Sequence, residues 1–417
     1  MKQYLLLMLF VLVTKLSVAQ CHTELENYTT AFDTIQAKSF SFLDEALNDI
    51  RIVGYGEDTH GTAEFTILAK ELMQYLNEKH DFKILIIETG FGEGLYLNDY
   101  IQGKRDDLKF VLKNINSTWR YKTKEFESLM NWLRDFNHKN EDKIYIYGCE
   151  MQYVRSEIDR IKDYLKSVES SYKIEGFEKY ELWNNFDENE KTDHFIAYAK
   201  LKKYFIENSE VFKSKTSEEE FNIAYHLVEI LGQFVTTINQ NNGQRKADFR
   251  DIYMGENILW IMSFYKHNKK AMYWAHNAHV GDWVDNGIVD VTGHQLRKLY
   301  GEYYFNIATD FGTGNFIAYP NDANKTGNWR FKTFTVDKVV ENTFTECLKN
   351  YGKPNTFLNF RATRTNEKLA YYINSELTSM SGAGARARSS ETETKVFGRA
   401  FDAIIYIDKT SEITWAD

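Results

Sequence analysis

A short apolar run that passes directly into a glycine-rich polar loop constrains this chain more than any other segment. Residues 51–65 read Arg-Ile-Val-Gly-Tyr-Gly-Glu-Asp-Thr-His-Gly-Thr-Ala-Glu-Phe, and an amphipathic helical pattern follows. Glycine lets a backbone turn sharply or approach a ligand closely. In open α/β sheets, ligands bind where the carboxyl end of a strand meets the amino end of a helix, so we expect a site at this loop. Its polar residues are Glu57, Asp58, Thr59 and His60.

Other apolar runs also end at ionisable side chains. Residues 83–88 end at Glu88, residues 143–148 precede Glu150, and residues 271–274 precede His276 and His279. Continuous apolar runs are typical of strands that are covered on both faces. Because the carboxyl ends of parallel strands meet at one edge of a sheet, we expect these side chains to gather there.

The chain as a whole predicts an α/β fold with a central, largely parallel sheet flanked by helices. Residues 154–268 contain no proline and are rich in Glu, Lys, Leu, Ile and Phe. This composition indicates a helical insertion of about four or five helices, which we interpret as structural packing that forms a wall of the active-site cleft. The predicted division is a first α/β part over 20–153, the insertion over 154–268 and a second α/β part over 269–417.

Smaller elements are predicted outside these landmarks. Residues 22–50 are expected to be helical. Beyond the second histidine motif we expect a helix over 294–300 and strands over 303–308, 316–319, 329–334, 356–360 and 403–407. Residues 381–390 are small and polar without periodicity, which favours a mobile loop near the mouth of the site.

The first residues have the features of a secretory signal peptide. Residues 1–13 carry one positive charge and then about ten apolar residues, and small residues stand at positions 17 and 19. The apolar run is shorter than the roughly 20 residues that span a membrane. We therefore expect residues 1–19 to be removed and the product to be secreted or periplasmic, without stable membrane insertion. A lipoprotein anchored through Cys21 fits less well, because Gln20 stands where a small residue is preferred.

Charge and cysteine content exclude several other classes. The net charge is −9 and basic residues are interspersed with acidic ones, so we expect no nucleic-acid partner. The three cysteines form no C-x-x-C pair and cannot build a disulfide framework. A bridge between Cys149 and Cys347 is one alternative. We expect two buried free thiols instead, because Cys149 ends an apolar run where cysteine behaves as a small hydrophobe.

Three motifs occur in a defined order along the chain. They are Gly-Glu-Asp-Thr-His-Gly-Thr at 56–62, Ile-Ile-Glu at 86–88 and Trp-Ala-His-Asn-Ala-His at 274–279. This ordered set resembles the erythromycin esterase family, hydrolases that open macrolide lactones, and the likeness extends from about residue 50 to residue 407. The resemblance implies hydrolysis of a lactone or other ester, with His60 as the base for an attacking water and with the acidic positions and the two later histidines around it.

The residue chemistry agrees with ester hydrolysis. A neutral imidazole can accept a proton near pH 7, so His60 is the expected base, and Glu57 and Glu88 are the expected supporting carboxylates. His276 and His279 would hold the carbonyl oxygen or protonate the leaving alkoxide. The chain has no G-x-S-x-G nucleophile elbow, and we expect no cofactor.

Other interpretations remain open from the sequence. A histidine after a strand can simply hydrogen-bond to backbone in a loop. On one helical turn, His276 and His279 would share a face, and together with a carboxylate they would suit zinc. A metal-dependent hydrolase and a non-catalytic protein that binds a ligand or metal in the same cleft are therefore the alternatives.

One difference from the family concerns the substrate. The resemblance implies an arginine on the helix after the histidine loop in members that act on macrolides, whereas this helix offers Lys70, which lacks the bidentate fork of arginine. Arg120 and Arg361 are the expected substitutes. We assign them to substrate binding together with Asp58 and Thr59, and we expect the partner to be a small-molecule ester or lactone.

Overall fold

The computed structural model describes residues 24–115, 119–176, 191–240, 243–285, 289–380, 384–388 and 392–416. The predicted signal peptide, Cys21 and part of the predicted loop over 381–390 lie outside these residues. Within the described ranges, no helix combines the length and the apolar character that crossing a membrane requires.

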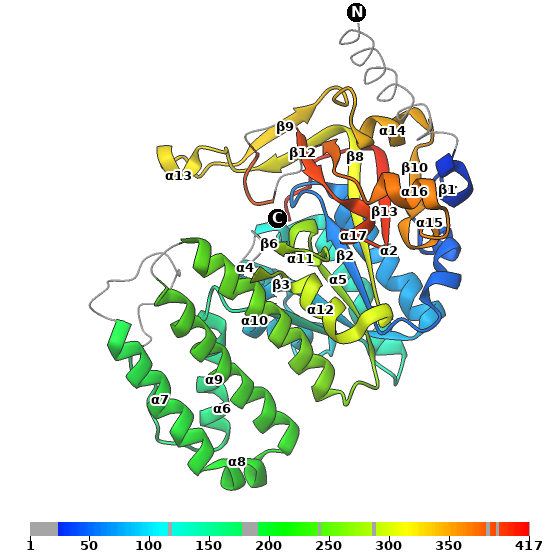
Figure 1. The fold of residues 1–417 in the computed structure, drawn as a ribbon. Helices are drawn as coiled ribbons and strands as arrows, with labels where there is room; N and C mark the ends of the chain where they lie inside the picture. The colour runs from blue at the N-terminus through cyan, green and yellow to red at the C-terminus, as the bar shows by residue number, and fades with distance from the viewer. Residues whose placement is uncertain are drawn as a thin grey trace, which may run out of the picture.

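A nine-stranded sheet forms the centre of the molecule (Figure 1). Its strands follow the order β1 (Thr29–Ala31), β10 (Asn355–Asn359), β13 (Ala403–Thr410), β8 (Tyr304–Ala318), β2 (Ile52–Glu57), β5 (Lys270–His276), β3 (Phe82–Gly90) and β4 (Tyr145–Glu150), and β9 (Lys332–Val336) pairs with β8. The strands from β13 to β4 run parallel to one another. The strands β1, β10 and β9 pair in the antiparallel sense. The predicted α/β fold with a largely parallel sheet is confirmed.

The strand register brings the predicted ionisable residues to one edge. Glu57 at the end of β2 is the register partner of His276 at the end of β5. On the other side of β5, Gly90 at the end of β3 is paired with Glu150 at the end of β4. The four strands therefore end together, as expected for parallel neighbours.

Helices cover both faces of the sheet. Alternate residues of β3 point to opposite faces, so that Leu85 packs in one core cluster and Ile84 in another. The first cluster includes α2 (Ala63–His80) and α5 (Lys124–Lys139). The second includes residues from helices of the insertion. Burial on both faces explains why these strands read as continuous apolar runs.

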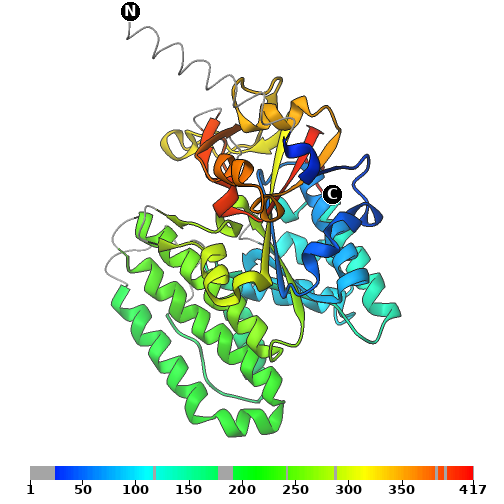
Figure 2. The same cartoon turned by 45° about the vertical axis from the view of Figure 1, so that its right-hand side comes forward.

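The insertion contains five helices among its described residues, and Figures 1 and 2 show them together on one side of the molecule. They are α6 (Arg155–Ser167), α7 (Lys191–Glu207), α8 (Ser209–Lys215), α9 (Glu218–Ile238) and α10 (Gly243–Phe264). Helix α10 packs on β4 and on α12 (Thr292–Tyr300). It therefore lies next to the sheet edge where the ionisable residues are.

The remaining elements complete the covering layers. They are η1 (Glu26–Tyr28), η2 (Ala37–Leu43), η3 (Glu45–Leu47), α3 (Phe91–Ile101), α4 (Leu108–Asn114), η4 (Trp119–Tyr121), α11 (Asn277–Val280), β6 (Val284–Asp285), β7 (Val289–Asp290), η6 (Gly301–Tyr303), α13 (Ala323–Thr326), α14 (Phe344–Asn350), α15 (Phe360–Thr363), α16 (Glu367–Ile373), β11 (Leu377–Met380), β12 (Thr392–Lys395) and α17 (Phe397–Ala400).

Two secondary-structure predictions were wrong. Residues 26–50, predicted within a helical segment over 22–50, contain three 3₁₀ helices and the edge strand β1 in place of an α-helical layer. At Thr29–Ala31, backbone pairing with β10 takes precedence over helical propensity. The two strands predicted over 303–308 and 316–319 are one continuous strand, β8. Its middle contains Gly312 and Gly314, which resemble a turn in the sequence, but pairing with β13 and β9 keeps it extended.

The cysteines differ from one another. Cys149 is a free thiol with no exposed surface, and burial raises its pKa well above the ordinary value, as predicted for a small hydrophobe. Cys347 is disulfide-bonded, so the prediction of two free thiols is wrong for Cys347. Since Cys149 is free, the alternative bridge between these two cysteines does not form.

Candidate active site

Three buried carboxylates lie at the carboxyl edge of the sheet. Glu57, Glu88 and Glu150 come from β2, β3 and β4, and their exposed fractions are 1%, 7% and 3%. An isolated carboxylate in such a place would take up a proton, because burial favours the neutral form. Ionised carboxylates here require cations beside them.

Arg120 is one of these cations. It comes from η4, is 2% exposed, and donates to Glu57 and, over 3.0 Å, to Oε2 of Glu88. Burial alone would raise the pKa of both carboxyls. Burial is the largest single effect, but Arg120 together with His60, and for Glu88 also His279 and Arg250, outweighs it. The pKa of Glu57 therefore lies below its usual value and that of Glu88 well below it. The Nε1–H of Trp274 holds the second oxygen of Glu57 at 2.9 Å.

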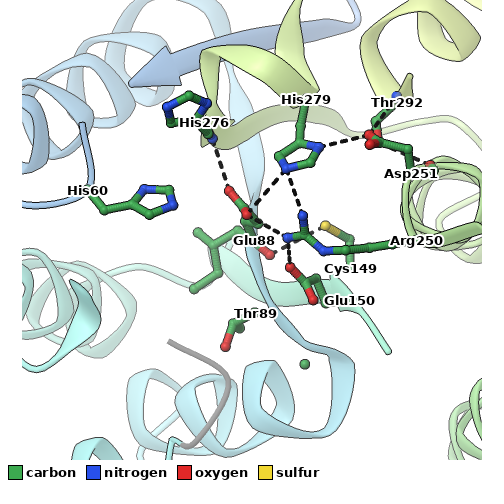
Figure 3. Close-up of polar contacts among 12 residues, drawn as sticks. His60, Glu88, Thr89, Cys149, Glu150, Arg250, Asp251, His276, His279 and Thr292 are labelled. Carbon is green, nitrogen blue, oxygen red and sulfur yellow. Dashed lines mark hydrogen bonds and ion pairs between the residues drawn. The ribbon is translucent and has the colours of Figure 1, made fainter. Parts of the chain in front are cut away.

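Arg250 is the second cation, and Figure 3 shows it beside Glu88 and His279. It lies on α10 and donates to Oε1 of Glu88 over 2.6 Å and to Glu150. Its Nη1 also lies 2.8 Å from Nε2 of His279. Glu88 is thus bound by Arg120 on one oxygen and by Arg250 on the other, which fixes its orientation between the two histidines His60 and His279.

His60 has one ring nitrogen bonded and the other available. Nδ1 lies 2.5 Å from Oε1 of Glu57 and 2.7 Å from Nη1 of Arg120. Nη1 itself donates to Oε1 of Glu57, and since an ionised carboxylate only accepts, the contact between Nδ1 and Oε1 places a proton on Nδ1. No described residue hydrogen-bonds to Nε2, which faces Gly384 closely enough that a Cβ added to this glycine would lie 3.7 Å from it. In its neutral form, His60 therefore presents an unoccupied lone pair on Nε2, as a general base requires.

His276 is held by backbone on both ring nitrogens. Nδ1 accepts from the amide of Ala278 over 3.1 Å, and Nε2 donates to the carbonyl oxygen of Asp58 over 3.1 Å. Burial, together with the neighbouring His60, lowers its pKa well below the usual value. The ring is neutral and has no free nitrogen in this arrangement, so it does not fit the predicted roles of holding the carbonyl oxygen or protonating the alkoxide. The geometry makes it a positioning residue for the loop of Asp58.

His279 forms a second histidine–carboxylate pair. Its Nδ1 lies 2.8 Å from Asp251, and that carboxylate accepts from the amide and hydroxyl of Thr292 over 3.1 and 2.9 Å (Figure 3). Burial would lower the pKa of His279, but Asp251 and Glu88 outweigh it, and the pKa lies above its usual value. His279 is therefore the histidine of the site that is suited to carry a proton near neutral pH.

The residues predicted to bind substrate are engaged within the protein. Asp58 is 1% exposed, and its Oδ1 lies 3.3 Å from Nδ2 of Asn277 and 3.5 Å from Nζ of Lys395. Thr59 has no exposed surface and is hydrogen-bonded to Thr62. Both residues lie in the predicted loop. Because they are buried and bonded to other residues of the protein, they stabilise the loop and do not face a substrate.

The prediction for Arg361 was wrong. Its guanidinium forms a bidentate pair with Asp402 over 2.9 and 2.7 Å and donates to the carbonyl oxygen of Tyr304. Asp402 precedes β13 and Tyr304 begins β8, so Arg361 lies at the amino ends of these strands, opposite the site. The guanidinium of an arginine can bind any carboxylate with two parallel hydrogen bonds. The sequence did not show that the carboxylate bound by Arg361 is Asp402 of the same chain, and not one on a substrate.

Two functional candidates were not predicted. Arg250 and Asp251 lie on the helical insertion, which the sequence presented as structural packing only. In the sequence they are an ordinary charged pair on a helix rich in charges, and no spacing rule relates them to Glu88 or His279. The insertion thus supplies side chains to the site as well as covering the sheet.

A cavity of about 840 Å³ opens beside His276. Its wall begins at His276 and Asn277 and continues along Trp283, Phe401 and Lys395. This volume is within the range of small-molecule sites, which lie preferentially at the carboxyl edge of such sheets.

The donor set does not suit a metal ion. Among the residues that the structure describes, no group of three or more His, Cys, Asp or Glu side chains is arranged to hold one. His276 and His279, the two histidines of the metal-dependent alternative, have their ring nitrogens in hydrogen bonds to backbone, Asp251 and Arg250.

Comparisons with known proteins identify the family. The family model described as erythromycin esterase matches residues 77–410. An erythromycin esterase type II from Escherichia coli is 23% identical over 364 residues, which cover 77% of this chain and 83% of the relative. A putative hydrolase, YbfO, from Bacillus subtilis is 24% identical over 323 residues, covering 66% and 69% of the two chains.

Solved structures show the same fold. A Bacillus cereus protein superposes with a TM-score of 0.83 at 23% identity, covering 96% of this chain and 99% of the other. An EreC erythromycin esterase variant, solved in its open conformation, gives a TM-score of 0.68 at 17% identity, with coverage of 93% and 99%.

Proposed function

The chain belongs to the erythromycin esterase family, which indicates a hydrolase acting on esters, and from that premise we propose that it hydrolyses a lactone or other ester with a water molecule activated by His60. One observation carries the proposal. Nδ1 of His60 is bonded to Glu57 over 2.5 Å while Nε2 is left without a bond to any described residue. A carboxylate fixed behind a histidine in this way sets its tautomer and stabilises the imidazolium that forms.

The first half of the reaction uses His60 and Glu57. A water molecule beside Nε2 gives its proton to His60, and its oxygen attacks the carbonyl carbon of the ester. The proton on Nδ1 stays with the imidazole, and Glu57 balances the new charge. Glu57 can do so because Arg120 and Trp274 keep it ionised and oriented. General-base catalysis of this kind contributes about 10²–10⁴-fold in rate.

The second half needs a proton for the leaving alkoxide. When the tetrahedral intermediate collapses, the bond between the acyl carbon and the alkoxide oxygen breaks. We assign the proton donor to His279, whose pKa is raised by Asp251 and Glu88 against the effect of burial. Its Nδ1 is bonded to Asp251, so the donating atom is Nε2, which in the structure lies 2.8 Å from Nη1 of Arg250. Proton transfer from Nε2 therefore requires Nη1 of Arg250 to move away, while Nη2 of Arg250 already contacts Glu88 and Glu150.

The substrate is tested directly by mass. The purified protein is incubated with a panel of macrolide lactones and of simple alkyl and aryl esters, and products are analysed by mass spectrometry. Ring opening adds the mass of one water molecule to a lactone, and a simple ester yields its acid and alcohol. Absence of both products across the panel, with folded protein, would contradict ester hydrolysis and favour a binding protein that uses the same cleft.

We also propose that the protein acts outside the cytoplasm after removal of residues 1–19. Expression of the full chain, fractionation and amino-terminal sequencing of the product test this. A product that begins at Gln20 in the exported fraction supports the proposal, and an uncleaved cytoplasmic product contradicts it.

A further inference from the structure

Five aromatic rings form a continuous cluster beside His60. They come from four separate segments at the carboxyl edge of the sheet and are Trp119, Tyr319, Trp329, Phe331 and Trp415. We call this group the aromatic cluster. Phe331 is at its centre, with ring centroids 4.1 Å from Tyr319, 4.8 Å from Trp119 and 5.1 Å from Trp415.

The aromatic cluster reaches from the catalytic loop to the solvent. At its inner end, the ring of Trp119 meets the ring of His60 edge to face at a centroid distance of 6.5 Å. At its outer end, Trp329 is 52% exposed and Trp415 is 38% exposed. The three rings between these ends, Trp119, Tyr319 and Phe331, are partly buried and contact one another, so a continuous aromatic path leads from the exposed tryptophans to His60.

Packing of the sheet does not account for this cluster. None of its five rings is a member of the buried clusters that cover the sheet faces. Isolated exposed apolar side chains are ordinary, but a contiguous exposed aromatic patch marks a binding surface. Tryptophan, tyrosine and phenylalanine attract another aromatic ring through stacked or edge-to-face contacts in addition to the area buried.

We propose that the aromatic cluster binds an aromatic ring in the acyl or alcohol part of the substrate, while the ester carbonyl lies beside His60. This inference rests on the ester hydrolysis proposed above and adds the class of substrate, an ester that carries an aromatic ring. Trp329 and Trp415 are then specificity residues that act on substrate binding and not on the chemical step.

A matched pair of substrates separates aromatic recognition from general apolar contact. Benzyl acetate and cyclohexylmethyl acetate have the same acyl group and similar size, and they differ in whether the six-membered ring is aromatic. We expect Trp329→Ala and Trp415→Ala to raise KM for benzyl acetate about three- to tenfold with little change in kcat. The same variants should change KM for cyclohexylmethyl acetate much less.

The chain offers a control for the loss of an exposed aromatic side chain. Tyr371 on α16 is 83% exposed and outside the aromatic cluster, so Tyr371→Ala should leave both KM values unchanged. Equal effects of the tryptophan variants on the two esters, or a loss confined to kcat, would overturn the proposal.

A binding measurement keeps this inference separate from the proposed reaction. 2-Acetylnaphthalene has no hydrolysable bond, and its saturated counterpart 2-acetyldecalin has no aromatic ring. Calorimetry should show tighter binding of the naphthalene compound to the wild-type protein and weaker binding in both tryptophan variants. If the tryptophan variants weaken binding of the naphthalene compound but no ester is hydrolysed, the aromatic site is retained and ester hydrolysis is rejected. If esters are hydrolysed but the wild type and both variants bind the naphthalene compound equally, ester hydrolysis is retained and the aromatic site is rejected.

Discussion

Removing Arg120 is the sharpest test of how the site is held together. The Arg120 side chain is 2% exposed and is hydrogen-bonded to Glu57, Glu88 and the hydroxyl of Tyr121, the last over 2.7 Å. Arg120→Met keeps most of the apolar volume and deletes the charge. Glu57 and Glu88 then lose their common counterion. Of these two carboxylates, only Glu88 still has an arginine partner, Arg250.

The expected loss of stability is large. Breaking a buried ion pair by removing one partner costs about 3–5 kcal/mol, because the remaining charge stays buried. Lys203→Met is the control, since its pair with Glu207 spans 3.6 Å between side chains that are 73% and 59% exposed. Pairs of that kind contribute no more than about 1 kcal/mol. Urea unfolding of both variants, followed by circular dichroism, measures the difference.

The loss should depend on pH with a definite sign. In the wild type the pKa values of Glu57 and Glu88 are depressed, so these groups stabilise the fold above their unfolded pKa and lose that contribution as the pH falls through the folded pKa. Without Arg120, both pKa values rise relative to those in the wild type, and protonation at lower pH relieves part of the buried charge. The destabilisation should therefore be larger at pH 8 than at pH 5. A loss below about 1 kcal/mol, or one that does not vary with pH, would refute the reasoning.

Three further outcomes concern Asp251, metal dependence and Glu157. Asp251→Asn removes the carboxylate that raises the pKa of His279 against burial, so the alkaline limb of the kcat profile should move to lower pH, and an unmoved limb would remove His279 as proton donor. Ester hydrolysis should survive prolonged dialysis against a strong chelator, and activity that is lost and then restored by one divalent ion would contradict direct activation of water by His60. Burial raises the pKa of Glu157 to about 8 in the folded protein, so this group ionises at lower pH in the unfolded chain than in the folded one. The stability of the wild type should therefore fall as the pH rises from about 5 to 8. Thermal unfolding of Glu157→Gln should show a weaker dependence of stability on pH over this range.

The parts of the fold that follow from local pattern were predictable. The strands β2, β3, β4 and β5 are continuous apolar runs that end in carboxylates or histidines, and parallel pairing places those ends together. The extended course of β8 was not predictable, because glycines that resemble a turn are held straight by neighbours distant in sequence. The edge strand β1 depends in the same way on β10.

In the site, contacts between residues close in sequence were predictable, and contacts between distant residues were not. His60 and Glu57 are three residues apart on one loop, so their contact is local and was expected. Arg250 and Glu88 are 162 positions apart in the sequence, and only the packing of α10 on β4 brings them together. Arg120 was predicted as a substrate contact, and its burial among carboxylates became apparent only when the strand ends were assembled around it.

The hydrolysis rate of His60→Asn tests the central claim most directly. Asparagine keeps a polar side chain that can bond Glu57 but removes the basic nitrogen at the Nε2 position. His138→Asn, which changes an exposed histidine near the end of α5, is the matched control. On any ester that the wild type cleaves, we expect kcat/KM to fall about 10²–10⁴-fold in His60→Asn. The thermal transition should stay unchanged, and the control should retain full activity. A folded His60→Asn protein with a kcat/KM close to that of the wild type would contradict His60 as the base that activates water.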